Sequence, residues 1–434
     1  MIKQLSFITY SMITLKNIRE NQDLISKKLK SKNFEVDKIE KLLKKDSKWR
    51  EGLVLVEKLK EKRNTASKQI SIFKKEKKPT DDLINEMKNV SLEIKEIDSR
   101  NDNLKMEIDN ILLDIPNIPH DSVPIGPDES SNKIIRTWGE KPEFKFEVKS
   151  HIEISEKLNL LDFRAGSKIS GSGFPVYIKR GAKLERSLIN FMLDMHVDNG
   201  YDEMFPPFLV NSDSMQTTGQ LPKFIDDMYQ MPKDELFCIP TAEVPVTNYY
   251  RSEQLDESKL PIKFAAYSAC FRREAGSYGK DTRGLLRLHQ FNKVELVKFA
   301  HPDNSYNELE LLLQDAEKVL QSLGLHYRVI ELCTGDLSFS AAKCYDIEVW
   351  SPYENKYLEV SSCSNFESFQ ANRGSIRFRS SKTGKMEFVH TLNGSGVATP
   401  RLVVALIENY QQKDGTIQIP EALQKYMNIS VIKD

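Results

Sequence analysis

The segment CFRREAGSYGKDTRGLLRLHQFNKVELVKF (Cys270–Phe299) decides the fold of this chain. Aromatic and apolar residues precede a glycine-punctuated loop, and the chain returns with partial alternation, which predicts an antiparallel β-hairpin. Side chains two residues apart share a strand face, so Arg272 is expected beside Glu274, and Phe291 beside Glu295. At about 3.3 Å per residue, Phe291 and Glu295 lie about 13 Å apart, roughly the reach of an aminoacyl adenylate.

These residue types suit such a ligand. An adenine ring stacks on an aromatic side chain, an amino group pairs with a carboxylate, and an arginine fork grips the phosphate and carboxylate oxygens between them. The alternative is an ordinary charged hairpin with one solvated face. Spacing alone leaves both interpretations open.

The composition indicates a globular protein of two domains, with 434 residues, 39% hydrophobic and 29% charged. No apolar run is long enough to span a bilayer, so no membrane partner is expected. Five scattered cysteines without a CxxC pair predict a reducing, cytoplasmic location and no cysteine zinc site. Residues 1–11 are interpreted as an extension or a misplaced start codon before Met12.

The N-terminal part is basic, because residues 1–78 hold 22 Lys and Arg against 10 Asp and Glu. Two long helical patterns follow, and steps of three and four predict an antiparallel coiled-coil arm over about Val36 to Ile115, with Asn101 at a core position. Gly52 and Arg63 interrupt the first pattern. The segment KKEKKPTDD (74–82), which lies between the two helical patterns, forms the tip of the arm. Basic charge favours RNA binding, while a dimerisation rod or a solvated helix surface remains an alternative.

A proline-rich stretch after the arm predicts a linker over residues 116–149. Residues 150–434 mix short strands and helices without a βαβ repeat, which predicts an α+β domain with a mainly antiparallel sheet flanked by helices. No GxxxxGK[ST] phosphate loop occurs, so a nucleotide would be held by side chains on a sheet.

Five segments together resemble the class II aminoacyl-tRNA synthetases, and closely the seryl-tRNA synthetases. The hairpin is similar to their motif 2. Four further strings follow in that family's order: GQLPKF (219–224), PTAEVPVTN (240–248), LEVSSCSNFESFQANR (358–373) and TLNGSGVATPRLVVALIENYQ (391–411). The resemblance covers the chain from about residue 12 and makes residues 12–115 a tRNA-binding domain and 150–434 a class II catalytic domain.

The resemblance implies an ATP-dependent serine–tRNA ligase whose catalytic arginines are Arg272 and Arg401. Serine binding is implied for Thr241, Ala242, Glu243, Arg272, Glu295 and Ser395. ATP binding is implied for Arg272, Arg273, Glu274, Phe291, Glu359, Val360, Ser361, Ser362 and Arg401. Mg²⁺ would be held with ATP by Glu359 and Ser362, and no zinc is expected. Thr399 is predicted to cap a helix that begins at Pro400, which places Arg401 in its first turn.

The resemblance also implies partners. The arm would grip the long variable arm of serine tRNA, and tRNA contacts are expected from Lys74, Lys75, Lys77, Lys78, Lys280 and Arg283. The segment Pro175–Val210 is similar to motif 1 and implies a homodimer with tRNA bound across subunits. Selenocysteine tRNA would be a further substrate where an organism has one.

Two other functions stay open on the sequence. A synthetase-like RNA-binding paralogue without chemistry is disfavoured by the intact motif residues. An amino-acid:carrier-protein ligase is disfavoured by the N-terminal arm. Serine-dependent pyrophosphate exchange, followed by charging of serine tRNA, distinguishes the three.

Overall fold

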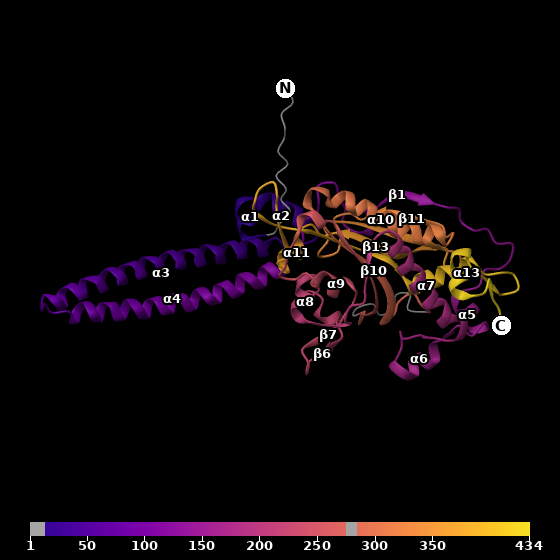
Figure 1. Ribbon diagram of the computed structural model, residues 1–434, viewed down its shortest axis with the longest axis horizontal. Helices are drawn as coiled ribbons and strands as arrows, with labels where there is room; N and C mark the ends of the chain where they lie inside the picture. The colour runs from indigo at the N-terminus through magenta and orange to yellow at the C-terminus, as the bar shows by residue number, and fades with distance from the viewer. Residues whose placement is uncertain (1–13, 275–283) are drawn as a thin grey trace, which may run out of the picture. The chain divides into compact units, whose positions relative to one another are not determined.

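The structure, a computed structural model, describes residues 14–274 and 284–434 (Figure 1). Its chain separates into two compact units, one that ends at Pro116 and one that runs from Asn117 to Asp434. Each unit has its own buried apolar core.

The N-terminal unit confirms the predicted helical arm. Its helices are α1 (Leu15–Glu20), α2 (Gln22–Ser31), α3 (Asp37–Lys75) and α4 (Asp81–Leu113). The long helices α3 and α4 run side by side (Figure 1) and bury a seam that includes Val56 and Ala66 of α3 and Val90 and Ile94 of α4. This seam follows the spacing of three and four predicted for α4.

Gly52 was expected to interrupt the first helical pattern, and the structure shows a different role. Gly52 and Asn101 are both buried where α3 meets α4. A Cβ atom at Gly52 would lie 2.2 Å from Oδ1 of Asn101, so the glycine leaves the space that the asparagine side chain fills. The two residues therefore mark one layer of the helix pair and support a role for Asn101 in fixing its register.

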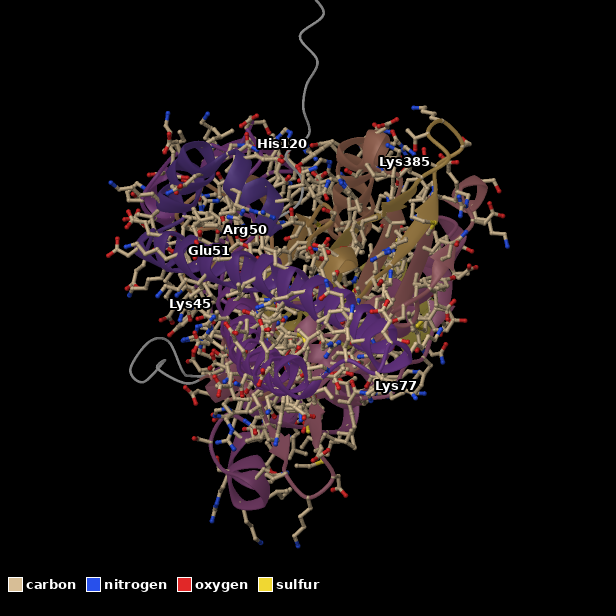
Figure 2. All side chains as sticks on the ribbon, turned by 90° about the vertical axis from the view of Figure 1, so that its left-hand side faces the viewer. Lys45, Arg50, Glu51, Lys77, His120 and Lys385 are labelled. Carbon is tan, nitrogen blue, oxygen red and sulfur yellow. The ribbon has the colours of Figure 1, made fainter. Side chains whose placement is uncertain are left out.

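Charge is divided unequally between the two long helices. The α3 segment carries 13 Lys and Arg against 6 Asp and Glu, whereas α4 carries 4 against 9. Part of this charge pairs across the seam, as in Lys62–Glu86 at 2.6 Å and Lys38–Asp114 at 3.5 Å. Lys45 and Arg50 project from α3, and Lys77 projects from the turn after it (Figure 2).

The C-terminal unit is built on an eight-stranded sheet of order β1-β11-β12-β13-β16-β10-β9-β4. Its strands are β1 (Lys133–Trp138), β4 (Asp202–Met204), β9 (Ile262–Phe271), β10 (Gln290–Ala300), β11 (Tyr327–Glu331), β12 (Lys343–Ser351), β13 (Lys356–Asn365) and β16 (His390–Ala398). Only the pairing of β4 with β9 is parallel within this sheet. The predicted α+β fold with a mainly antiparallel sheet is confirmed.

Strand β10 divides its side chains between two faces. Val294 and Leu296 join the large core that also contains side chains of α7 (Lys179–Asp198), α10 (Ser305–Ser322) and α12 (Thr399–Asn409). Val297 and Phe299 join a separate core on the other face. The odd-numbered side chains nearer the start of the strand are left to line a cavity on that second face.

The remaining elements surround the sheet. The helices are α5 (His151–Lys157), α6 (Phe163–Ser170), α8 (Ser212–Thr217), α9 (Glu243–Asn248), α11 (Phe369–Arg373) and α13 (Glu421–Met427). Small sheets pair β2 (Leu161–Asp162) with β3 (Val176–Tyr177), β5 (Leu209–Asn211) with β7 (Leu236–Cys238) and β6 (Gln230–Met231), β8 (Gln254–Leu255) with β14 (Arg377–Arg379) and β15 (Met386–Phe388), and β17 (Ile417–Gln418) with β18 (Val431–Ile432).

The segment predicted as a linker, residues 116–149, differs from a simple connection. It contains β1, which pairs with β11 as an edge strand of the main sheet. The β-branched pair Ile134–Ile135 in KIIRTW suits a strand, but the nearby prolines dominate the composition of the segment. Within the described residues, no helix combines the length and the apolar content that crossing a membrane would require.

Candidate active site

A cavity of about 800 Å³ opens over the middle of the main sheet. Its walls come from the neighbouring strands β13, β16 and β10, from the end of β9, and from the start of α12. Most of the predicted site residues line it: Thr241, Glu243, Arg272, Glu274, Phe291, Glu295, Glu359, Val360, Ser362, Ser395 and Arg401. This volume suits a ligand of nucleotide size.

The predicted hairpin is present, since β9 and β10 pair antiparallel with Phe271 opposite Gln290 and Ala266 opposite Glu295. Phe291 and Glu295 share one strand face, as predicted, because they are four residues apart in one regular strand. The same prediction does not apply to Arg272 and Glu274, because β9 ends at Phe271 and Glu274 has a φ of +51°. Both nevertheless reach the cavity.

Arg272 and Phe291 already contact each other at the mouth of the hairpin. The guanidinium carbon of Arg272 lies 5.1 Å from the centre of the Phe291 ring, and its Nε donates to the carbonyl of Pro240 at 3.3 Å. Beside them, Glu274 forms an ion pair with Arg287 at 3.1 Å. One end of the site therefore contains an aromatic ring, two arginine side chains and a carboxylate.

Glu295 is completely buried at the other end. Its Oε2 accepts from the hydroxyl of Thr241 and contacts the ammonium of Lys293, and its Oε1 accepts from the amide of Asn393 at 3.3 Å. A charge buried this deeply is stable only when paired and hydrogen-bonded. The partners come from β10 itself, from β16 and from the segment before α9.

Glu243 lies in the same buried corner. Burial, followed by the charge of Glu295, raises the pKa of Glu243 to about 7. Gln370 opposes the rise by donating from Nε2 to the carboxylate at 2.6 Å, and Thr391 donates to Oε1 of Gln370 at 2.7 Å. Glu243 is thus a carboxyl group that changes charge near neutral pH, where a cationic ligand would favour its ionised form.

Strand β13 brings Glu359 and Ser362 to the cavity by means of a bulge. Ile347 pairs with Ser361 and the next residue, Glu348, pairs with Glu359, so Val360 is the extra residue. Bulges redirect side chains in this manner and are common beside active sites. Opposite Ser362 in β12, burial and the charge of Glu359 raise the pKa of Asp346 well above its usual range.

Arg401 lies in the first turn of α12, as predicted, but the helix begins one residue earlier than expected. Ala398 occupies the N-cap position, where it makes no side-chain capping hydrogen bond, and Thr399 is the first helical residue. The hydroxyl of Thr399 instead lies within hydrogen-bonding distance of the Glu185 carboxyl group and of the carbonyl of Asn292, which explains why it does not cap the helix. Arg401 Nη1 donates to the carbonyl of Glu359 at 2.8 Å and lies 3.5 Å from its carboxylate.

Three predicted residues are not brought into the cavity lining. Arg273 donates to the carbonyl of Met228 and packs over Tyr229. Ala242 is buried in the core beneath the site, and Ser361 donates to the carbonyl of Ser395 at 2.6 Å. Lys280 and Arg283 fall outside the described residues. The four tip lysines Lys74, Lys75, Lys77 and Lys78 are exposed.

Several residues at the site were not predicted from the sequence. Lys293 and Asn393 contact Glu295, Arg287 contacts Glu274, and Gln370 contacts Glu243. Lys293 was recognisable, because it falls on the same strand face midway between Phe291 and Glu295. Gln370 carries no such signal, since it reaches Glu243 only through tertiary folding.

Two family models match the chain. Residues 12–119 match the seryl-tRNA synthetase N-terminal domain, and residues 224–410 match the tRNA synthetase class II core domain (G, H, P, S and T). The serine–tRNA ligase of Caldicellulosiruptor saccharolyticus is 58% identical over 423 residues, 97% of this chain and 100% of that protein. That of Carboxydothermus hydrogenoformans is 55% identical over 422 residues, 97% of this chain and 99% of that protein.

The chain belongs to the seryl-tRNA synthetase family. Solved structures agree with this assignment. The seryl-tRNA synthetase of Pyrococcus horikoshii complexed with ATP has a TM-score of 0.92 at 36% identity and covers 97% of this chain and 99% of its own. The cytoplasmic serine–tRNA ligase of Naegleria fowleri in complex with AMP has a TM-score of 0.85 at 28% identity, covering 95% of this chain and 96% of its own.

Proposed function

We propose that this cavity catalyses the activation of serine by ATP and the transfer of the seryl group to serine tRNA. The observation that carries the proposal is the arrangement on one face of β10. Phe291 and Glu295 both open into the 800 Å³ cavity, and Arg272 lies against Phe291 at its edge. An aromatic face for adenine, a carboxylate for the substrate ammonium and a guanidinium between them suit a bound aminoacyl adenylate.

Two displacement steps make up the reaction. A serine carboxylate oxygen attacks the α-phosphorus of ATP, and pyrophosphate leaves with the electron pair of the broken P–O bond. The 3′-hydroxyl of the terminal tRNA ribose then attacks the acyl carbon and AMP leaves. Arg272 holds the two reacting groups together and stabilises the charge that develops on the phosphate, so no covalent enzyme intermediate is needed.

The other end of ATP is assigned to the bulged part of β13 and to α12. Arg401 and the positive end of α12 suit the terminal phosphates. Glu359 and Ser362 offer hard oxygen atoms at the cavity, and burial together with the charge of Glu359 raises the pKa of the neighbouring Asp346. Magnesium bound there would neutralise charge on the pyrophosphate.

Serine selection is assigned to the buried corner. Thr241, Glu295 and Ser395 supply polar groups for the substrate hydroxyl and ammonium, and Glu243 adds a second carboxyl group. A pocket that hydrogen-bonds a hydroxyl rejects alanine strongly, because its polar groups would be left unpaired.

We further propose that the arm binds serine tRNA, with most phosphate contacts on α3, where the basic excess lies. A homodimer through the segment Pro175–Val210 is supported by exposed Phe205, 74% exposed, which lies beside Phe208 and edge strand β4. Cytoplasmic location and the charging of selenocysteine tRNA stay predictions.

Replacing Arg272 tests the site directly. Arg272→Ala is expected to lower serine-dependent pyrophosphate exchange by about 100-fold or more, because it removes charge-assisted bonds to phosphate and carboxylate. Arg273→Ala is the matched control, since the Arg273 side chain packs over Tyr229 and does not line the cavity, and exchange should stay within about fivefold of the parent. Near-normal exchange in a folded Arg272→Ala protein would contradict the assignment.

The pH dependence of serine binding tests the role of Glu243. The substrate ammonium favours the ionised carboxylate, so binding releases a proton wherever Glu243 is protonated in the empty site. The KM for serine should therefore fall about tenfold as pH rises from 6 to 8 at saturating ATP. Glu243→Gln should remove most of this change. A KM in the parent protein that is flat over this range would show that Glu243 does not meet the ammonium.

Deleting the arm separates the two half-reactions. Replacement of residues 36–115 by a short linker should leave serine activation within about twofold and abolish efficient tRNA charging, because the residues that line the cavity begin at Gly219, outside the arm. Reversing the charge of the four tip lysines should raise the KM for tRNA, but it should impair charging less than deletion of the whole arm does. Normal charging by the armless protein would make the arm a rod without an RNA-binding role.

A further inference from the structure

Lys293 occupies the centre of the cavity without an assigned function. It lies in β10 between Phe291 and Glu295, its side chain is only 7% exposed, and it lines the cavity. Its ammonium contacts Oε2 of Glu295 directly. Side chains at alternate strand positions are about 7 Å apart, so Lys293 stands about midway between the proposed adenine and ammonium positions. That midpoint is where the reacting phosphate of an aminoacyl adenylate would lie.

When no substrate is bound, the positive charge of Lys293 balances negative charge in the buried corner of the cavity. Two buried carboxyl groups, Glu243 and Glu295, share this corner, and the positive charges of Lys293 and Arg272 oppose the rise that burial causes in the pKa of Glu243. Arg272 lies at the mouth, against Phe291. Lys293 is therefore the cation in direct contact with Glu295 among the described residues.

Binding of the substrate changes this balance. The ammonium of serine brings its own positive charge to Glu295, and two ammonium groups on one carboxylate oxygen repel each other. A lysine has a flexible four-carbon stem and three rotatable donors, so its head group can move while its backbone stays in the strand. The adjacent anionic group is then the α-phosphate.

We propose that Lys293 holds the place of the substrate ammonium in the empty site and turns to the α-phosphate when serine binds, where it acts as a catalytic residue. This inference rests on the proposed function. Lys293 donates hydrogen bonds to non-bridging oxygens of the α-phosphate while the new O–P bond forms and the bond to pyrophosphate breaks. It keeps its proton throughout, and pyrophosphate leaves with the electron pair.

Lys293→Met tests the proposal by steady-state pyrophosphate exchange. The kcat should fall at least 100-fold, while the KM for serine should not rise, because the substitution also removes the ammonium that competes with serine for Glu295. Lys298→Met is the matched control. Lys298 is a buried, ion-paired lysine of the same strand on the opposite face, bonded to Glu308 at 3.0 Å, and its loss should leave kcat within threefold.

A double substitution guards against misfolding, because Lys293→Met alone leaves Glu295 buried without its cation. Glu295→Gln and Glu295→Gln/Lys293→Met both remove that unpaired charge. If Lys293 acts on the phosphate, kcat at saturating serine should be at least tenfold lower in the double variant than in Glu295→Gln. Equal kcat values in these two proteins would show that Lys293 acts only through Glu295 and would overturn the proposal.

Arg272→Ala, measured in the same series, separates this inference from the proposed function. Loss of exchange in Arg272→Ala with normal kcat in Lys293→Met overturns only the role of Lys293. Normal exchange in both variants overturns the site assignment itself.

Discussion

The buried carboxylate of Glu295 is the constraint on which the rest of the site depends. A charge removed from water is costly unless partners surround it, and the partners of Glu295 come from three places. Thr241 precedes α9, Lys293 lies in β10, and Asn393 lies in β16. Satisfying one carboxylate therefore fixes the segment before α9 and two strands relative to each other, and these are the elements that enclose the serine corner.

The alternation of β10 links stability to chemistry. Val294 and Leu296 lie in the core shared with α7, α10 and α12, while Phe291, Lys293 and Glu295 face the cavity. Slipping the strand by one residue would exchange these two sets, placing charged groups in the helix-facing core. Pairing with β9 on one side and β16 on the other holds the register, so the apolar residues that stabilise the sheet also aim the functional ones.

Periodicity explains what was predictable. The α4 seam and the face shared by Phe291 and Glu295 followed from spacing alone, because helices and regular strands repeat. Irregular backbone could not be predicted in the same way: β9 stops before Arg272, a bulge at Val360 turns Glu359 toward the cavity, and α12 begins at Thr399 rather than at Pro400. Gly52 was interpreted as an interruption of the first helical pattern, because Asn101, the buried residue that packs against it, lies 49 residues away in the sequence. Residue roles within the site came from family resemblance, which spacing could not replace.

The most direct test of the account is a crystal structure of the protein with a non-hydrolysable analogue of seryl-adenylate. The adenine ring should stack on Phe291 and the ammonium group should lie within about 3 Å of the Glu295 carboxylate, with Arg272 on the group that replaces the phosphate. An analogue bound in the reverse direction, or with its ammonium away from Glu295, would show that this face of β10 does not set the geometry of the reaction.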